Sequence, residues 1–321
     1  MDVPLADWMI GLATDPRRRA DFERDPDAAL ASSGLGRAAR LALRQGDAGG
    51  IRAALRARRA GALTVVGTGF GHAHLTPQTV QAVSGADRVV FRALGPVLAG
   101  WVRGLNPGAE SLDGLFESGR PLAACCEALA GRLLELVRQG AAVCAVFPGH
   151  PAFLDYPACD AVRRVREAGF TAVILPAISP EDLLYAEAGL DPGRAGCSTF
   201  EATDFLVHRR RFDPTSALVL LQAGAAGTLG RPGVGAEAGL AELGRVLGAH
   251  YEPHHEVLVL ETAPDLATPP AVRRFPLAEL SGTRLSPLAV LLVPPLPPRP
   301  PDPGMMRRLG LALGAGKEAA P

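Results

Sequence analysis

Aromatic residues, long apolar runs and net charge are all scarce or absent in this sequence. Phe, Trp and Tyr make up 5% of its residues, and 33 Lys and Arg balance 33 Asp and Glu at pH 7. A chain without a net field has no electrostatic reason to bind nucleic acid or an anionic membrane, so neither partner is expected. The longest apolar runs, such as Leu288–Val293, are far shorter than the roughly 20 residues that cross a bilayer.

Cysteine and histidine are also sparse, and their spacing excludes two classes of site. The five cysteines lack paired spacing and no charged-then-apolar leader opens the sequence, so reduced thiols and a cytoplasmic location are expected. His72 and His74 lie close together without a third ligand at metal spacing, so no metal site is expected.

The first part of the chain has a helical pattern. Apolar residues recur at three- and four-residue spacing from Leu5 to Leu12, and Asp25–Pro26 is typical of the start of a second helix. No period-two alternation occurs before Gly61. Residues 1–60 are therefore predicted to form a small all-helical docking module.

After Gly61 the pattern changes to short apolar runs separated by helical segments. These runs are Ala62–Val66, Arg88–Arg92, Ala142–Phe147, Thr171–Leu175 and Ala217–Gln222. Such alternation predicts an α/β protein with a mostly parallel sheet and crossover helices, one of them over Cys125–Gly140. Later runs at Val257–Glu261 and Leu288–Val293 predict strands of a second sheet. We predict α/β lobes over 61–176 and 177–297, and a proline-rich flexible tail over 298–321.

Glycine- and proline-rich turns follow the predicted strands. Gly67, Thr68 and Gly69 follow the first strand, with a spacing that differs from the G-x-G-x-x-G of dinucleotide-binding turns. The segment 147–151 follows the strand that starts at Ala142, and 176–179 follows the next one. Open α/β sheets bind ligands at the carboxyl ends of their strands, so these turns are expected to form the walls of one crevice. A tight structural turn without a ligand is the alternative interpretation.

Four ordered motifs resemble the tetrapyrrole-methylase superfamily, and further segments are similar to its borosin-type peptide α-N-methyltransferases. The superfamily motifs are Leu63–Gly69, Val146–Pro151, Leu175–Asp182, and Ser286–Pro287 ahead of Val293–Pro295. The borosin-like segments are Ala186–Pro192, Gly196–Leu206 and Leu218–Gln222. The resemblance covers roughly residues 62–297. A separate segment, Phe22–Leu30 with the turns near Gly34 and Gly46, resembles the small helical subunit of aromatic-ring-opening dioxygenases.

The resemblance implies a homodimer of two-domain protomers with a mostly parallel first sheet and a mixed second sheet. It also implies that S-adenosylmethionine binds between the two domains. The cofactor-binding residues implied are Phe147, Pro148, Gly149, His150, Phe153, Ser179, Pro180, Gln222, Ser286 and Pro287. The turn of Gly67, Thr68 and Gly69 would lie on the substrate side.

The catalytic residues implied by the borosin likeness are not retained. An amide nitrogen is a poor nucleophile, so its methylation needs a base and a group that stabilises charge on the amide oxygen. The tyrosine positions of those enzymes fall on Asp113, Phe116 and Cys126, and their arginine position falls on Leu122. Candidate replacements are Arg120 as the cation and Asp113 or Cys126 as the proton acceptor.

Three activities remain open at this point. The chain methylates a peptide with altered catalytic residues, methylates a tetrapyrrole or another small molecule, or keeps the fold as a cofactor- or peptide-binding scaffold without turnover. A peptide substrate is a possible partner, and the helical module is predicted either to tether it or only to stabilise the fold. The short apolar segment Met305–Leu313 is similar to the tails that borosin enzymes methylate on themselves.

Overall fold

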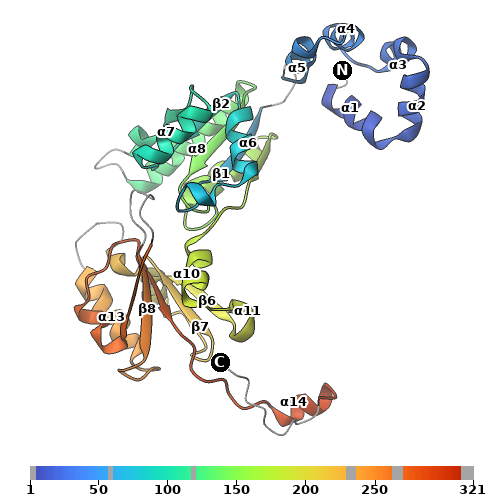
Figure 1. The fold of residues 1–321 in the computed structure, drawn as a ribbon. Helices are drawn as coiled ribbons and strands as arrows, with labels where there is room; N and C mark the ends of the chain where they lie inside the picture. The colour runs from blue at the N-terminus through green and yellow to red at the C-terminus, as the bar shows by residue number, and fades with distance from the viewer. Residues whose placement is uncertain (1–4, 57–60, 117–120, 229–235, 262–269, 312–321) are drawn as a thin grey trace. The chain divides into compact units, whose positions relative to one another are not determined.

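A computed structural model describes residues 5–56, 61–116, 121–228, 236–261 and 270–311 of the chain (Figure 1). The chain divides into two units, Met1–Ser179 and Pro180–Pro321. Within the described ranges, no helix combines the length and the apolar character that a membrane span requires.

Five short helices make up the N-terminal module. They are α1 (Leu5–Thr14), α2 (Pro16–Arg24), α3 (Pro26–Ser32), α4 (Arg37–Gln45) and α5 (Ala48–Arg56). Leu5, Leu30 and Leu35 form their buried core, and Trp8 packs edge-on against Phe22 with ring centroids 5.4 Å apart. The predicted all-helical character is thus present in the structure.

Asp–Pro pairs start several helices of this chain. In each pair the aspartate carboxylate accepts a hydrogen bond from an amide in the first turn, and proline takes an early position where no amide hydrogen is needed. The pairs begin at Asp15, Asp25, Asp191 and Asp302. Because Asp15–Pro16 also starts a helix, Asp25–Pro26 opens the third helix, and the prediction that it opens the second was wrong.

The first sheet has five strands in the order β3-β2-β4-β1-β5, and every pair is parallel. The strands are β1 (Ala62–Gly67), β2 (Arg88–Phe91), β3 (Glu110–Ser111), β4 (Ala142–Phe147) and β5 (Thr171–Ile174). This arrangement confirms the mostly parallel first sheet. The sequence missed only the two-residue edge strand β3, which is too short to form an apolar run.

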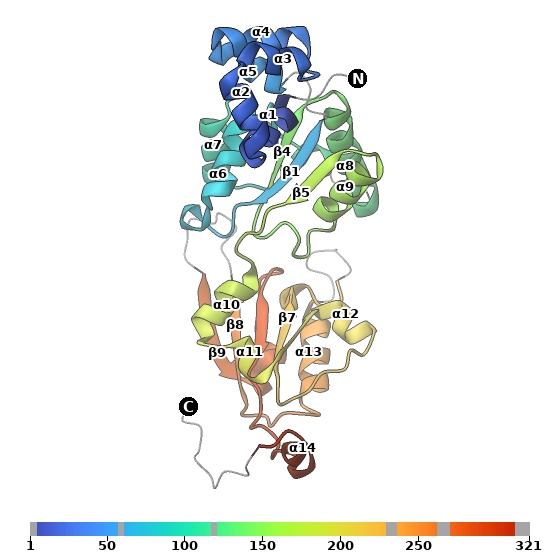
Figure 2. The same ribbon diagram turned by 90° about the vertical axis from the view of Figure 1, so that its right-hand side faces the viewer.

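Helices cover both faces of this sheet. α6 (Pro77–Gly85) and α7 (Pro96–Leu105) pack on one face, and α8 (Leu122–Arg138) and α9 (Tyr156–Glu167) pack on the other (Figure 2). The neighbouring strands β1 and β4 therefore lead into helices on opposite faces. Such a divergence opens a crevice at the carboxyl ends of the two strands.

The second sheet has the order β6-β7-β10-β8-β9, in which only β6 and β7 are parallel. Its strands are β6 (Cys197–Glu201), β7 (Ala217–Leu221), β8 (Glu256–Glu261), β9 (Ala271–Pro276) and β10 (Val290–Val293). The mixed second sheet is thus confirmed. The edge strands β6 and β9 were not predicted, because neither contains a fully buried residue and so neither forms an apolar run.

The helices of the second unit are α10 (Pro180–Ala188), α11 (Pro192–Ala195), α12 (Ala202–Val207), α13 (Ala236–Leu247) and α14 (Pro303–Arg308). α12 and α13 pack on the buried side of the sheet, where Phe205 and Leu243 join the core. α14 lies in the segment predicted to be a tail. It forms because Asp302 caps it and Pro303 opens it, a local signal that the high proline content concealed. Residues 312–321 lie outside the described part of the chain.

Candidate active site

The turns that follow β1 and β4 are joined by their backbones. The Thr68 amide donates a hydrogen bond of 3.0 Å to the carbonyl oxygen of Phe147. Gly69 and Gly149 then exchange two amide-to-carbonyl hydrogen bonds, of 3.1 and 3.0 Å, as a short antiparallel bridge. Because each turn satisfies the other's amides, the two turns are held together at the carboxyl ends of their strands.

Glycine is required where these turns meet. A Cβ atom on Gly67 would lie 2.1 Å from the carbonyl oxygen of Gly149 and 2.7 Å from the Cβ of Ala177. Gly69 and Gly149 have φ angles of +59° and +62°, which side chains disfavour. The loops after β1, β4 and β5 therefore converge at the carboxyl ends of their strands.

His150 stabilises the second of these turns. Its Nδ1 accepts a 3.0 Å hydrogen bond from the Ala152 amide, and its carbonyl oxygen accepts a 2.9 Å bond from the Phe153 amide. A ring nitrogen that accepts leaves the proton of a neutral imidazole on Nε2. Phe147 is only 1% exposed and packs in the core, so this residue presents its backbone to the turn. Pro148 and Phe153 are half-buried.

Ser179 and Pro180, two further residues of the implied cofactor set, lie at the division between the units. Ser179 is the last residue of the first unit and is buried. Pro180 is the first residue of the second unit and opens α10.

In the second unit, the turn after β7 meets the segment before β10. Gln222 has a left-handed backbone with φ 55° and ψ 36°, and the Ala223 amide donates a 2.8 Å hydrogen bond to the carbonyl oxygen of Ala289. A Cβ on Gly224 would lie 2.0 Å from the carbonyl oxygen of Ser286. The structure thus packs the turn that follows Gln222 against the segment that contains Ser286, and Pro287 in that segment is exposed.

Ser286 combines a fixed backbone with a hydroxyl that lacks a partner. Its amide donates a 2.7 Å hydrogen bond to Oε1 of Glu261, whose Oε2 lies 3.4 Å from Nε of Arg273. Its Oγ is buried and makes no hydrogen bond within the described residues. Buried polar atoms are usually paired, so this hydroxyl points to a group that binds beside it.

A charged pair lies at the carboxyl end of β2. A guanidinium nitrogen of Arg92 is 3.6 Å from Oδ2 of Asp155, and the two side chains are 23% and 12% exposed. The guanidinium also lies 4.1 Å above the centre of the Phe116 ring, a cation–π contact. Burial raises the pKa of Asp155, and attraction to Arg92 offsets part of that rise.

Two predicted catalytic residues, Cys126 and Asp113, lie near this pair. Arg92 acts electrostatically on Cys126, whereas Asp113 binds the backbone beside Arg92. Burial raises the pKa of the Cys126 thiol, while the nearby Arg92 lowers it. Asp113 has both carboxylate oxygens engaged: Oδ1 accepts a 2.7 Å hydrogen bond from the Ala93 amide, and Oδ2 accepts one of 2.7 Å from Ser111 Oγ. Asp113 therefore fixes the backbone beside Arg92. Arg120 lies outside the described residues.

Sequence reasoning missed Arg92 and Asp155. The available signals were weak: Arg92 is the one charge that closes the apolar run of β2, and Asp155 precedes the Tyr156–Pro157 start of α9. Only the fold shows that these two positions meet.

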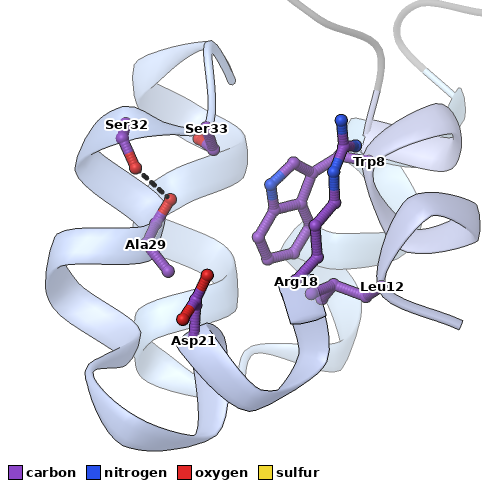
Figure 3. A pocket seen from close by; sticks show the side chains of 7 residues that line it. All are labelled: Trp8, Leu12, Arg18, Asp21, Ala29, Ser32 and Ser33. Atoms are coloured by element: carbon purple, nitrogen blue, oxygen red, sulfur yellow. Dashed lines mark hydrogen bonds between the residues drawn. The ribbon is translucent and has the colours of Figure 1, made fainter. Parts of the chain in front are cut away.

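The helical module has a hollow of its own, with a volume of about 480 Å³. Figure 3 shows the residues that line it, which come from α1, α2, α3 and the turn after α3. The lining residues are Trp8, Leu12, Arg18, Asp21, Ala29, Ser32 and Ser33. An indole, a guanidinium and a carboxylate around one hollow offer apolar surface and charges of both signs.

Comparison with solved structures defines the class of fold. A uroporphyrin-III-C-methyltransferase from Thermus thermophilus superposes with a TM-score of 0.52 at 22% sequence identity, over 73% of this chain and 92% of that one. The family model of the tetrapyrrole (corrin/porphyrin) methylases matches residues 62–272. The chain belongs to this methylase family.

Relatives of higher sequence identity include two methyltransferases joined to peptide precursors. A methyltransferase/ribosomally synthesized type I borosin cyclic peptide precursor of Coprinopsis marcescibilis is 37% identical over 170 residues, which cover 53% of this chain and 44% of the relative. A precursor of the same description from Serendipita vermifera subsp. bescii is 30% identical over 260 residues, 78% of this chain and 63% of the relative. The chain thus spans less than two thirds of the length of either relative.

The close approach at Gly67 generates a stability prediction. Gly67→Ala should lower the free energy of unfolding by about 1–3 kcal/mol, because the new methyl group must displace the backbone of the Gly149 turn. Gly131→Ala, in the middle of α8 where nothing lies within 4 Å, should raise it by about 0.5–1 kcal/mol. Urea denaturation of both variants checks this; equal effects would show that the turns do not meet.

Proposed function

We propose that this chain is an S-adenosylmethionine-dependent methyltransferase that methylates a peptide backbone nitrogen. Its membership of the methylase family supports methyl transfer. The relatives named as methyltransferases fused to ribosomally synthesized cyclic peptide precursors support a peptide acceptor. The observation that carries the proposal is the unpartnered Ser286 hydroxyl in the second unit, next to the glycine-dependent turn of Gly224.

The residues present fit S-adenosylmethionine. Its ribose, amino acid and adenine groups need hydrogen-bonding partners in a narrow space, and turns without side chains let backbone amides and carbonyls approach a ligand closely. At Gly224 the absence of a side chain lets the turn after β7 pack directly on the backbone of Ser286. The buried Ser286 Oγ has hydrogen-bonding capacity left for a ligand, and the half-buried Gln222 next to it offers an amide group.

Methyl transfer from this cofactor requires no covalent bond between the substrate and the protein. When bound, S-adenosylmethionine supplies a methyl group on a positively charged sulfur. Transfer breaks the carbon–sulfur bond, forms a carbon–nitrogen bond and releases the proton of the nitrogen, leaving S-adenosylhomocysteine. The protein has to align the acceptor with the methyl group, exclude water and accept the proton.

A peptide acceptor is better supported than the two alternatives. Methylation of a tetrapyrrole or another small molecule has only the fold-level likeness behind it. The relatives named as methyltransferases favour turnover over a scaffold without it. The hollow of the helical module, with apolar and charged lining, is consistent with a surface that holds the peptide. We also propose a homodimer in the cytoplasm, with the cysteines reduced.

Incubation with S-adenosylmethionine should add one or more methyl masses to a peptide. The substrates are a pool of synthetic peptides made of small apolar residues, a peptide with the sequence of residues 305–313 of this chain, and the purified chain itself. Mass spectrometry with fragmentation locates each added methyl group. Methylation of no peptide, with methylation of a small-molecule acceptor instead, would contradict the peptide assignment.

The Gly224 turn generates a binding prediction. Gly224→Ala should weaken S-adenosylhomocysteine binding about tenfold or more, a loss of about 1.4 kcal/mol, because the added methyl group must push the Ser286–Pro287 segment away. Gly244→Ala is the matched control, since it lies in α13 of the same unit with nothing within 4 Å. Isothermal titration calorimetry measures both affinities, and unchanged binding by Gly224→Ala would remove this turn from the site.

A further inference from the structure

The Arg92–Asp155 pair is held by strained backbone on both sides. Four non-glycine residues with positive φ occur in the described part of the chain, at 93, 154, 209 and 222. Ala93, with φ 54°, directly follows Arg92, and Leu154, with φ 55°, directly precedes Asp155. Left-handed backbone is costly for residues with side chains, and such strain gathers at functional sites. Asp113 fixes the first of these residues by accepting the hydrogen bond of its amide.

Asp155 fills only part of the structural role that its position offers. It precedes α9, where an aspartate normally accepts hydrogen bonds from the first amides. Its side chain makes no capping hydrogen bond of ordinary geometry, although the nearby Ala158 amide lowers its pKa. Its Oδ1 is buried without a partner within the described residues, and its Oδ2 lies 3.6 Å from Arg92, beyond hydrogen-bond distance. A buried carboxylate with this much unused accepting capacity is poised to take a proton from a third group.

We infer that Arg92 and Asp155 form the acid–base pair of the methyl transfer, with Asp155 accepting the proton of the acceptor nitrogen and Arg92 stabilising negative charge on the adjacent carbonyl oxygen. This inference rests on the proposed function. Arg92 directly follows β2, and Asp155 lies in the connection from β4 to α9, on the side of the sheet where parallel strands place their ligands.

The proton balance of the step is complete. The nitrogen gains the methyl group and loses its hydrogen to a carboxylate oxygen of Asp155, which becomes a neutral carboxylic acid and later releases the proton to water. The sulfonium becomes a neutral thioether, so the products together carry one positive charge as that free proton. Arg92 remains charged throughout, because guanidinium does not lose its proton in this pH range.

The charged and titratable groups around Asp155 predict how the stability of the protein depends on pH. Arg92 faces it from the end of β2, Cys126 from α8 and Cys159 from α9. Burial raises the pKa of Asp155, so the folded protein binds the proton more tightly than the unfolded chain does. The ionised carboxylate therefore lowers stability above its folded-state pKa, and this penalty fades as the pH falls through that value.

Asp155→Asn separates a chemical from a structural role. We expect methyl transfer to the peptide pool to fall about a hundredfold or more, while S-adenosylhomocysteine binding persists. The urea midpoint should stay unchanged or rise at neutral pH, with the difference from wild type vanishing near the ordinary carboxyl pKa. Arg92→Lys should also slow transfer, because a point charge does not replace the planar guanidinium.

Asp160→Asn is the matched control. Asp160 lies on the same helix and is 3% exposed, but it is paired with Arg163 at 2.5 Å. Its loss should lower the urea midpoint and leave the transfer rate per folded protein unchanged. In the wild type, the transfer rate should rise with pH as Asp155 ionises, and Asp155→Asn should abolish this limb of the profile.

The outcomes distinguish this inference from the proposed function. If Asp155→Asn transferred methyl groups as fast as the wild type and lost stability as Asp160→Asn does, the Arg92–Asp155 pair would be structural. That result would overturn this inference and leave the proposed function standing. A wild-type chain that transfers no methyl group to any tested acceptor would overturn the proposed function, and this inference with it.

Discussion

The short backbone bridge between Gly69 and Gly149 is the contact on which the candidate site depends. β1 and β4 are neighbours in the sheet, but they lead into helices on opposite faces, so their turns would otherwise diverge. Two amide-to-carbonyl hydrogen bonds tie these turns together. Because α9 begins only a few residues after Gly149, the bridge also sets the starting point of the segment that carries Asp155.

Strand burial explains which parts of the fold the sequence predicts. Both central strands of the first sheet, β1 and β4, are buried on both faces and therefore appear as continuous apolar runs. The edge strands β6 and β9 contain no fully buried residue, so no apolar pattern marks them. A different reason hid α14: the high proline content around it concealed the local signal of its Asp302 cap.

The candidate site divides in the same way. The turns of Gly67–Gly69 and of Gly149 are local features, so their residue types and order along the chain are enough to predict them. Arg92 and Asp155 belong to separate crossover units, and their meeting follows from strand order. Alignment placed Phe116 and Cys126 at positions expected to be catalytic. In the fold, the Arg92 guanidinium lies near both residues. The spacing of these residues along the sequence does not reveal this neighbour.

The absence of side chains at Gly67 has an evolutionary consequence. A surface made of backbone atoms is nearly the same whichever residues surround it, and the space beside Gly67 admits no larger residue. Few substitutions at this position would therefore leave the fold intact. The region of Arg92, Phe116 and Cys126 consists of side chains, each replaceable by a single codon change. Diversification toward new acceptors would therefore accumulate near β2, while the glycine turns stay constant among descendants of this scaffold.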